Sequence, residues 1–128
     1  MKNKGQIVRI FDLVTTNAIS IGELVRRPLL FPPIVTGIKA AIKSGQWTVI
    51  GNIPVDDFEY PYFISAMYDG VRKKMGLWYL WDGNKYTPID YKLPKEYKKF
   101  EQLVVWAPGD VEKRIETGVN PIDYWLDL

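Results

Sequence analysis

Apolar residues are densest between positions 29 and 54, where glycines interrupt them at short intervals. The stretch opens with the apolar run 29–35 and later carries Trp47 beside β-branched residues. Its glycines are Gly37, Gly45 and Gly51. This pattern is typical of buried strands joined by tight turns. We therefore expect the stretch to form the core, with a strand over residues 47–51 and Trp47 as its largest apolar side chain.

Two further apolar runs predict an antiparallel meander. They cover residues 63–67 and 75–81, and the segment between them is polar and basic, which predicts a hairpin loop. The pair Asp82-Gly83 then separates the second run from residues 85–88, and such a pair favours a tight hairpin. Three strands joined in this way lie side by side in one sheet.

Helix signals occur at four places along the chain. Ser20 and Glu23 have the spacing of a capping box, and Pro28 ends the helix that they begin. Elsewhere, apolar residues recur at spacings of three and four, as on the buried face of a helix. In the last helix that face would carry Val111 and Ile115. The predicted helices cover residues 21–27, 38–43, 93–100 and 108–117, and Gly118 follows the end of the last one.

These elements predict an α+β fold, a mainly antiparallel sheet of hairpins and a meander packed with about three short helices. Further strands are expected over residues 6–14 and 103–106. A chain of 128 residues has the length of one domain, so we expect residues 1–128 to fold as a unit. Residues 119–128 form an apolar C-terminal tail that must dock on the domain or on a partner.

Composition narrows the function classes. The net charge is only +2, and the chain has neither cysteine nor histidine. It therefore lacks the side chains of Ser-His-Asp and Cys-His triads and of thiolate or imidazole metal sites. No apolar run reaches membrane-spanning length. We expect a cytoplasmic binding protein, with no enzymatic activity, no cofactor, no metal and no membrane partner.

Acidic, aromatic and basic side chains nevertheless supply candidates for contacts with a partner. The acidic loop carries Asp56 and Asp57, whose side chains point opposite ways in an extended segment, so we interpret it as a solvated rim rather than a metal or general-base site. Such a rim could orient a basic partner. The candidates are Asp56, Asp57, Glu59, Tyr60, Tyr62, Arg72, Lys73, Lys74 and Trp81.

Two interpretations remain open for Trp81. Residues 77–81 are apolar at every position, so they could be a central, fully buried strand. Alternatively, Trp81 beside the Asp82-Gly83 turn could be an exposed aromatic anchor. Aromatic residues near the basic hairpin loop would also suit single-stranded nucleic acid, which is the less favoured partner because no recognised RNA-binding motif is present.

A longer motif adds a resemblance to a known family. The motif residues are Pro28 to Phe31, Ala41, Ser44, Gly45, Trp47, Val49 to Asn52, Pro54, Trp106 to Val111, Arg114, Ile115 and Gly118. In this order they resemble the bacterial immunity protein 26 family of polymorphic-toxin systems, roughly from residue 7 to residue 118. By that resemblance a family hairpin before the strand at residues 6–14 is missing, which leaves an exposed sheet edge.

The resemblance implies a cytoplasmic inhibitor that binds and neutralises a cognate bacterial toxin domain by stoichiometric occlusion, without turnover. The motif residues with an implied structural role are Gly45, Trp47, Gly51, Asn52 and Trp106. The exposed sheet edge would also allow a homodimer. The alternatives are an orphan structural or interaction domain and, less favoured, a single-stranded nucleic-acid-binding module.

Overall fold

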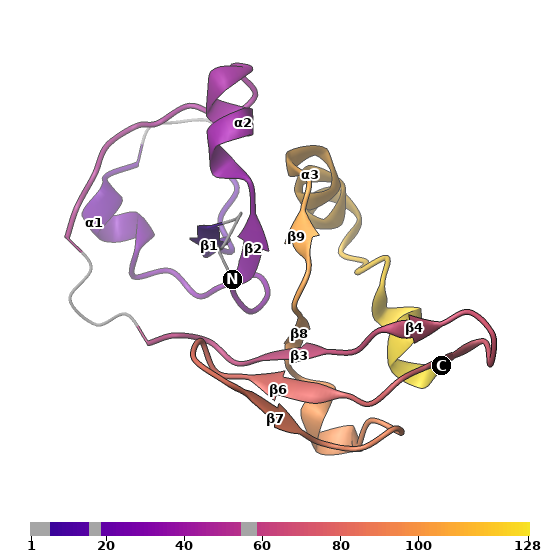
Figure 1. Ribbon diagram of the computed structural model, residues 1–128. Coiled ribbons are helices and arrows are strands. Elements are labelled where there is room, and N and C mark those ends of the chain that lie inside the picture. The colour runs from indigo at the N-terminus through magenta and orange to yellow at the C-terminus, as the bar shows by residue number, and fades with distance from the viewer. Residues whose placement is uncertain (1–5, 16–18, 55–58) are drawn as a thin grey trace. The chain divides into compact units, whose positions relative to one another are not determined.

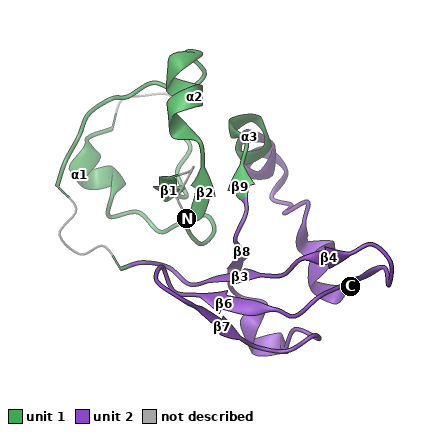
Figure 2. Ribbon diagram, in the orientation of Figure 1, with its two compact units in different colours: residues 1–59, 105–111 green, residues 60–104, 112–128 purple. Residues whose placement is uncertain are grey.

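The computed structural model describes residues 6–15, 19–54 and 59–128, and it divides the chain into two compact units (Figure 2). Unit 1 consists of residues 1–59 and 105–111, and unit 2 of residues 60–104 and 112–128. Within the described residues there are three sheets, mostly antiparallel with some parallel pairs, and three α-helices with short 3-10 helices (Figure 1). The predicted α+β class is confirmed. No helix in this part of the chain is long and apolar enough to cross a membrane.

Unit 1 is built around a short buried strand. Its sheet has the order β1 (Gln6–Val8), β2 (Ile34–Thr36) and β9 (Val105–Trp106), with β1 antiparallel and β9 parallel to β2. All three residues of β2 are buried. The Thr36 hydroxyl donates a hydrogen bond to the Trp106 carbonyl at 2.5 Å, so the polar group in this core is paired. The strand predicted over residues 6–14 is therefore shorter, with one further bridge between Phe11 and Leu29.

The two helices of unit 1 begin where the sequence predicts. α1 (Ile21–Leu24) has Ser20 at its N-cap, and the Ser20 hydroxyl accepts a hydrogen bond from the Glu23 amide at 3.3 Å. α2 (Ile38–Lys43) has the predicted bounds and buries Ala41. The chain leaves α2 through Gly45, whose φ of 79° is a backbone conformation that favours glycine.

The predicted strand over residues 47–51 is wrong. The Trp47 amide donates to the Ala41 carbonyl at 3.1 Å, so the chain folds back on the end of α2 instead of entering a sheet. Val49 and Ile50 are 63% and 70% exposed, and Trp47 is only partly buried. Gly51 packs directly against the Ile21 side chain, where a Cβ atom would collide with it. The apolar motif after Gly45 therefore lines the surface of unit 1.

Unit 2 contains the predicted meander, extended by one parallel strand. Its larger sheet has the order β7-β6-β3-β8, in which β6 is antiparallel to β3 and to β7, and β8 is parallel to β3. The bounds are β3 (Phe63–Ser65), β6 (Tyr79–Trp81), β7 (Tyr86–Pro88) and β8 (Glu101–Gln102). A separate two-stranded hairpin, β4 (Tyr68–Asp69) with β5 (Lys74–Met75), carries the predicted basic loop.

The largest fully buried side chain is Trp78 of unit 2, whereas the sequence pattern predicted that it would be Trp47. Trp78 is 1% exposed and packs in one cluster with Ile64, Met75 and Leu93. The C-terminal tail closes this cluster, because Trp125 and Leu126, in the 3-10 helix η2 (Asp123–Asp127), pack against it. The tail thus docks on its own unit.

The helix predicted over residues 93–100 is only a single 3-10 turn, η1 (Lys95–Tyr97). The chain must enter β8 at Glu101, which leaves no room for a longer helix. The strand predicted over residues 103–106 is likewise confined to β9, its last two residues.

The last helix has the predicted bounds, but its buried face differs from the predicted one. α3 (Pro108–Thr117) buries Val111, whereas Ile115 is 40% exposed and Arg114 is buried in its place. The Arg114 guanidinium donates two hydrogen bonds to the Glu101 carboxylate, at 2.5 and 3.0 Å. Burying both charges is tolerated because each satisfies the other in a bidentate pair.

Removing one partner of this pair should be more harmful than removing both. Arg114→Met leaves the Glu101 carboxylate buried without its cation, and we expect it to lower the free energy of unfolding by about 3–5 kcal/mol. The double variant Arg114→Met/Glu101→Leu should recover much of that loss. Urea unfolding followed by circular dichroism measures both, and equal destabilisation of the single and double variants would contradict the assignment.

Candidate partner-binding surfaces

Three aromatic residues of unit 2 interlock where β6 turns into β7, and we call Tyr60, Trp81 and Tyr86 the aromatic corner. The Trp81 indole N–H donates a hydrogen bond to the Tyr60 hydroxyl at 3.2 Å. The rings of Trp81 and Tyr86 lie 4.5 Å apart between centroids. Trp81 is half-buried as a result, so it is neither a free anchor nor part of a fully buried strand; between residues 77 and 81 only Trp78 is buried.

The turn beside the corner has local causes. The Asp82 carboxylate accepts hydrogen bonds from the Asn84 and Lys85 amides, at 2.8 and 2.9 Å. These bonds, first that from Lys85, lower the pKa of Asp82 below its ordinary value. Gly83 has a φ of 97°, and a Cβ atom there would lie 2.6 Å from the Tyr60 ring. Glycine is thus required both by the turn and by the aromatic contact.

The acidic-loop candidates separate in the structure. Asp56 and Asp57 lie outside the described residues, and Glu59 is exposed. Tyr60 joins the aromatic corner, whereas the half-exposed Tyr62 ring contacts Phe100 at 5.7 Å between centroids. Among the residues that the structure describes, no group of three or more acidic side chains could hold a metal ion.

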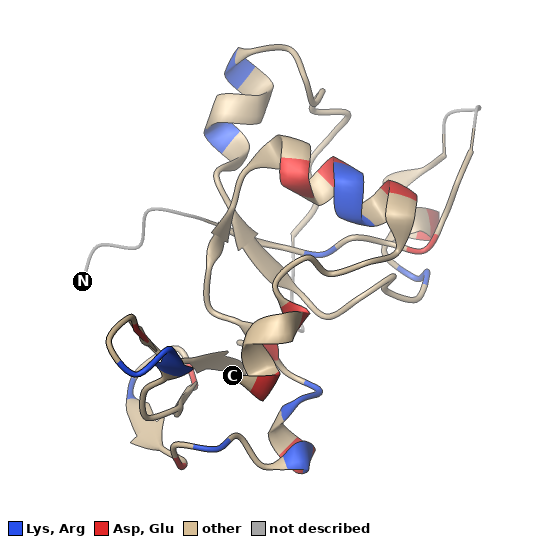
Figure 3. Cartoon of the chain, turned by 90° about the vertical axis from the view of Figure 1, so that its right-hand side faces the viewer, with Lys and Arg blue, Asp and Glu red and all other residues tan. Residues whose placement is uncertain are grey.

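The basic candidates lie on a well-organised hairpin. The Asp69 carboxylate accepts hydrogen bonds from the Arg72 and Val71 amides and from Arg72 Nε, at 3.2, 3.0 and 3.0 Å. These bonds, first that from the Arg72 amide, lower the pKa of Asp69. Arg72, Lys73 and Lys74 are all exposed as predicted for a loop. Figure 3 shows that other basic positions are scattered among acidic ones along the chain.

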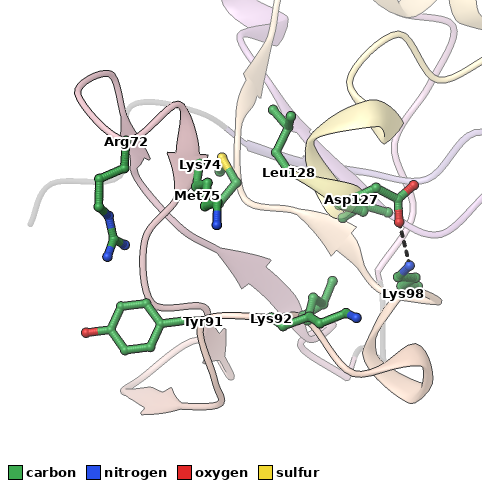
Figure 4. A pocket seen from close by; sticks show the side chains of 10 residues that line it. Arg72, Lys74, Met75, Tyr91, Lys92, Lys98, Asp127 and Leu128 are labelled. Atoms are coloured by element: carbon green, nitrogen blue, oxygen red, sulfur yellow. Dashed lines mark hydrogen bonds and ion pairs between the residues drawn. The ribbon is translucent and has the colours of Figure 1, made fainter.

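The sequence did not reveal a pocket of about 620 Å³ beside this hairpin (Figure 4). It lies within unit 2, between the hairpin, residues 91–93 and the C-terminal tail. Its lining consists of Arg72, Lys74, Met75, Tyr91, Lys92, Leu93, Lys98, Leu126, Asp127 and Leu128. Four of these side chains are basic and one is acidic. The apolar C-terminal tail was the one sequence feature that pointed to this pocket. Where the tail docks depends on long-range packing, which the sequence pattern does not give.

The motif residues for which the resemblance implied a structural role differ in burial and in local role. Gly45 and Gly51 serve a turn and a close approach, as expected of glycines. Trp106 is buried on β9, whereas Trp47 is only half-buried and Asn52 is exposed. These residues belong to unit 1, whereas the aromatic corner and the basic pocket belong to unit 2.

Comparison with known families gives one match. The profile described as immunity protein 26 matches residues 1–77, well over half of the chain. The match includes the motif from Pro28 to Pro54 and the basic hairpin, and the remainder of the resemblance, beyond residue 77, lies outside it. No curated protein and no solved structure matches the chain significantly.

Gly83→Ala should destabilise unit 2, because alanine at this φ is strained and its methyl group would collide with Tyr60. We expect a loss of about 1–3 kcal/mol in the free energy of unfolding. Gly70→Ala is the matched control, since a Cβ atom there would meet nothing within 4 Å. Equal unfolding midpoints for the two variants would refute the proposed packing of the corner.

Asp82 should titrate below its ordinary pKa of 3.8 in the folded protein. Because the folded pKa is lowered, its contribution to stability is complete above the unfolded value and is lost as the pH falls through the folded value. NMR titration of the Asp82 carboxyl resonance measures this, and Asp82→Asn should reduce the acid sensitivity of folding. A midpoint at or above 3.8 would be inconsistent with the hydrogen-bonded turn.

Proposed function

The chain belongs to the immunity protein 26 family, and we propose that it binds a cognate bacterial toxin domain one to one and occludes the toxin's active site. Membership of this family implies toxin neutralisation, and the family match is the observation that carries the proposal. Inhibition by occlusion needs a complementary surface and no catalytic group. In this proposal the protein acts in the cytoplasm, without a cofactor, and leaves the toxin chemically unchanged.

The aromatic corner supports this proposal as one part of the contact surface. Tyr and Trp provide large contact areas with few rotatable bonds, and they are enriched among residues that dominate binding energies. In this protein Tyr60 and Tyr86 already hold the Trp81 ring. Binding would therefore lose little side-chain entropy at the corner.

The edge position of β1 among the described strands is a second feature of the proposal. β1 lies at the edge of its three-stranded sheet, with β2 on one side. An edge strand of this kind can pair with another chain, so a homodimer through β1 is compatible with the arrangement. The toxin complex does not depend on it.

Co-expression of the tagged protein with the product of the adjacent reading frame tests the function. We expect a stable one-to-one complex on size-exclusion chromatography with light scattering, and suppression of the neighbour's toxicity. Failure to form a complex, with the protein folded and the neighbour still toxic, would refute toxin neutralisation by binding.

Substitutions at the corner test the surface within that complex. Trp81→Ala should weaken binding by about 10–100-fold, as at a dominant interface residue. Because Trp81 also packs internally, Tyr86→Ala serves as a second variant, and both must retain the wild-type circular dichroism spectrum. Tyr124→Ala is the matched control, since Tyr124 is an exposed aromatic residue of the same unit outside the corner. Unchanged affinity in folded Trp81→Ala and Tyr86→Ala would exclude the corner.

A further inference from the structure

The pocket of unit 2 combines an apolar floor with a basic rim. Met75 and Leu93 form part of the floor and are buried in the core cluster, and Leu126 packs against the same cluster. Figure 4 shows Arg72, Lys74 and Met75 on one side, Lys98 and Asp127 on the other, and Tyr91 and Lys92 along a third. A ligand in this space would meet apolar side chains below it and positive charges around it.

Two of the four basic side chains already have acidic partners. Arg72 pairs with Asp69 at 3.0 Å and Lys98 with Asp127 at 2.7 Å, both at exposed positions. Exposed pairs of this kind contribute little to stability, so either cation can turn toward a ligand at small cost. Lys74 and Lys92 form no ion pair within the described part of the chain. The rim therefore carries more positive charge than its own acids neutralise.

The remaining wall of the pocket is aromatic. The Tyr91 side chain is exposed, and the Arg72 guanidinium lies 5.9 Å from the centroid of its ring. This contact places one face of the ring beside a positive charge, which suits an apolar group with a carboxylate next to it. A volume of about 620 Å³ is that of a site for several side chains rather than for one small ion.

We propose that this pocket binds an acidic segment of a partner chain, with an apolar side chain against Tyr91, Leu126 and Leu128 and carboxylates facing Lys74 and Lys92. This rests on the proposed function in one respect, namely that the partner is the cognate toxin. The chemistry of the segment follows from the pocket itself. Charge complementarity would mainly accelerate and orient the encounter, and burial of the apolar area that Tyr91, Leu126 and Leu128 still expose would supply the lasting contact.

Nucleic acid and small anions fit the same pocket less well. A strand of nucleic acid needs a basic groove that follows its backbone, whereas this pocket is lined by the acidic side chain of Asp127, and Arg72 is paired with Asp69. A small anion would leave the apolar floor uncovered. An acidic peptide with an apolar centre uses both features.

A defined peptide tests the pocket without the toxin. The probe is acetyl-Glu-Glu-Leu-Phe-Glu-Glu-amide, titrated into ¹⁵N-labelled full-length protein, with its Lys-for-Glu counterpart as the control peptide. We expect saturable shifts of the Lys74, Met75, Lys92 and Leu93 amides with the acidic peptide only, reduced at least about tenfold in affinity by Lys74→Glu/Lys92→Glu. Absence of saturable shifts at these residues would overturn the proposal.

Two further probes separate the competing ligands. Equal saturation by inorganic phosphate, or by a peptide with Ala-Ala at its centre, would show a simple anion site and overturn the proposal. Tighter binding of an oligothymidylate, with a steep dependence on salt, would reassign the pocket to nucleic acid.

The toxin complex tests the identity of the partner. Lys74→Glu/Lys92→Glu should weaken the complex at least about tenfold, whereas Lys95→Glu/Lys113→Glu, which makes the same charge change at exposed residues outside the pocket, should not. Peptide binding with an unaffected toxin complex would refute the pocket as the toxin contact and leave toxin neutralisation standing. A wild-type protein that forms no complex would refute the proposed function, and the peptide titration would still decide the pocket.

Discussion

A buried ion pair holds the framework of unit 2. Arg114 and Glu101 are each less than a tenth exposed, and two hydrogen bonds join their charged groups. Because an unpaired charge in this position would be strongly unfavourable, the pair fixes the part of α3 that belongs to unit 2, residues 112–117, against β8. β8 in turn lies parallel to β3, with Glu101 opposite Phe63. The strand that carries the buried residues Phe63 and Ile64 is therefore kept in register by a charge pair on its neighbour.

Both candidate surfaces depend on that framework. β3 lies between β8 and β6, and the end of β6 carries Trp81 of the aromatic corner. Gln102, the residue after Glu101 on β8, donates a hydrogen bond from its side chain to the Ile122 carbonyl at 2.8 Å. This bond ties the tail to β8, and the tail supplies Leu126, Asp127 and Leu128 to the basic pocket. A single local arrangement thus supports both surfaces.

Features set by neighbouring residues could be predicted from the sequence. The Ser20 cap, the hairpin at Asp82-Gly83 and the end of α3 at Gly118 each follow from a hydrogen bond or a backbone angle within a few residues. The family resemblance, which also rests on a local motif, agrees with the match over residues 1–77. That residues 1–128 fold as one domain stays a prediction, and the structure divides the chain into two compact units.

Features set by long-range packing could not be predicted. Trp47 and Trp78 both lie in stretches whose pattern predicts a strand, and only the position of each in the tertiary structure decides that Trp78 is buried. The spacing of α3 favoured Ile115 as a buried residue, because a pattern of apolar residues cannot anticipate that Arg114 finds Glu101. The basic pocket was missed for the same reason, since its residues come from four separate segments.

Titration of the toxin's activity with this protein tests the central claim most directly. Stoichiometric occlusion predicts that activity falls linearly and reaches its minimum at one equivalent, when both concentrations are far above the Kd. It also predicts that the toxin regains full activity after the complex is denatured and the two chains are separated. Inactivation by much less than one equivalent, or a toxin that stays inactive after separation, would contradict the account.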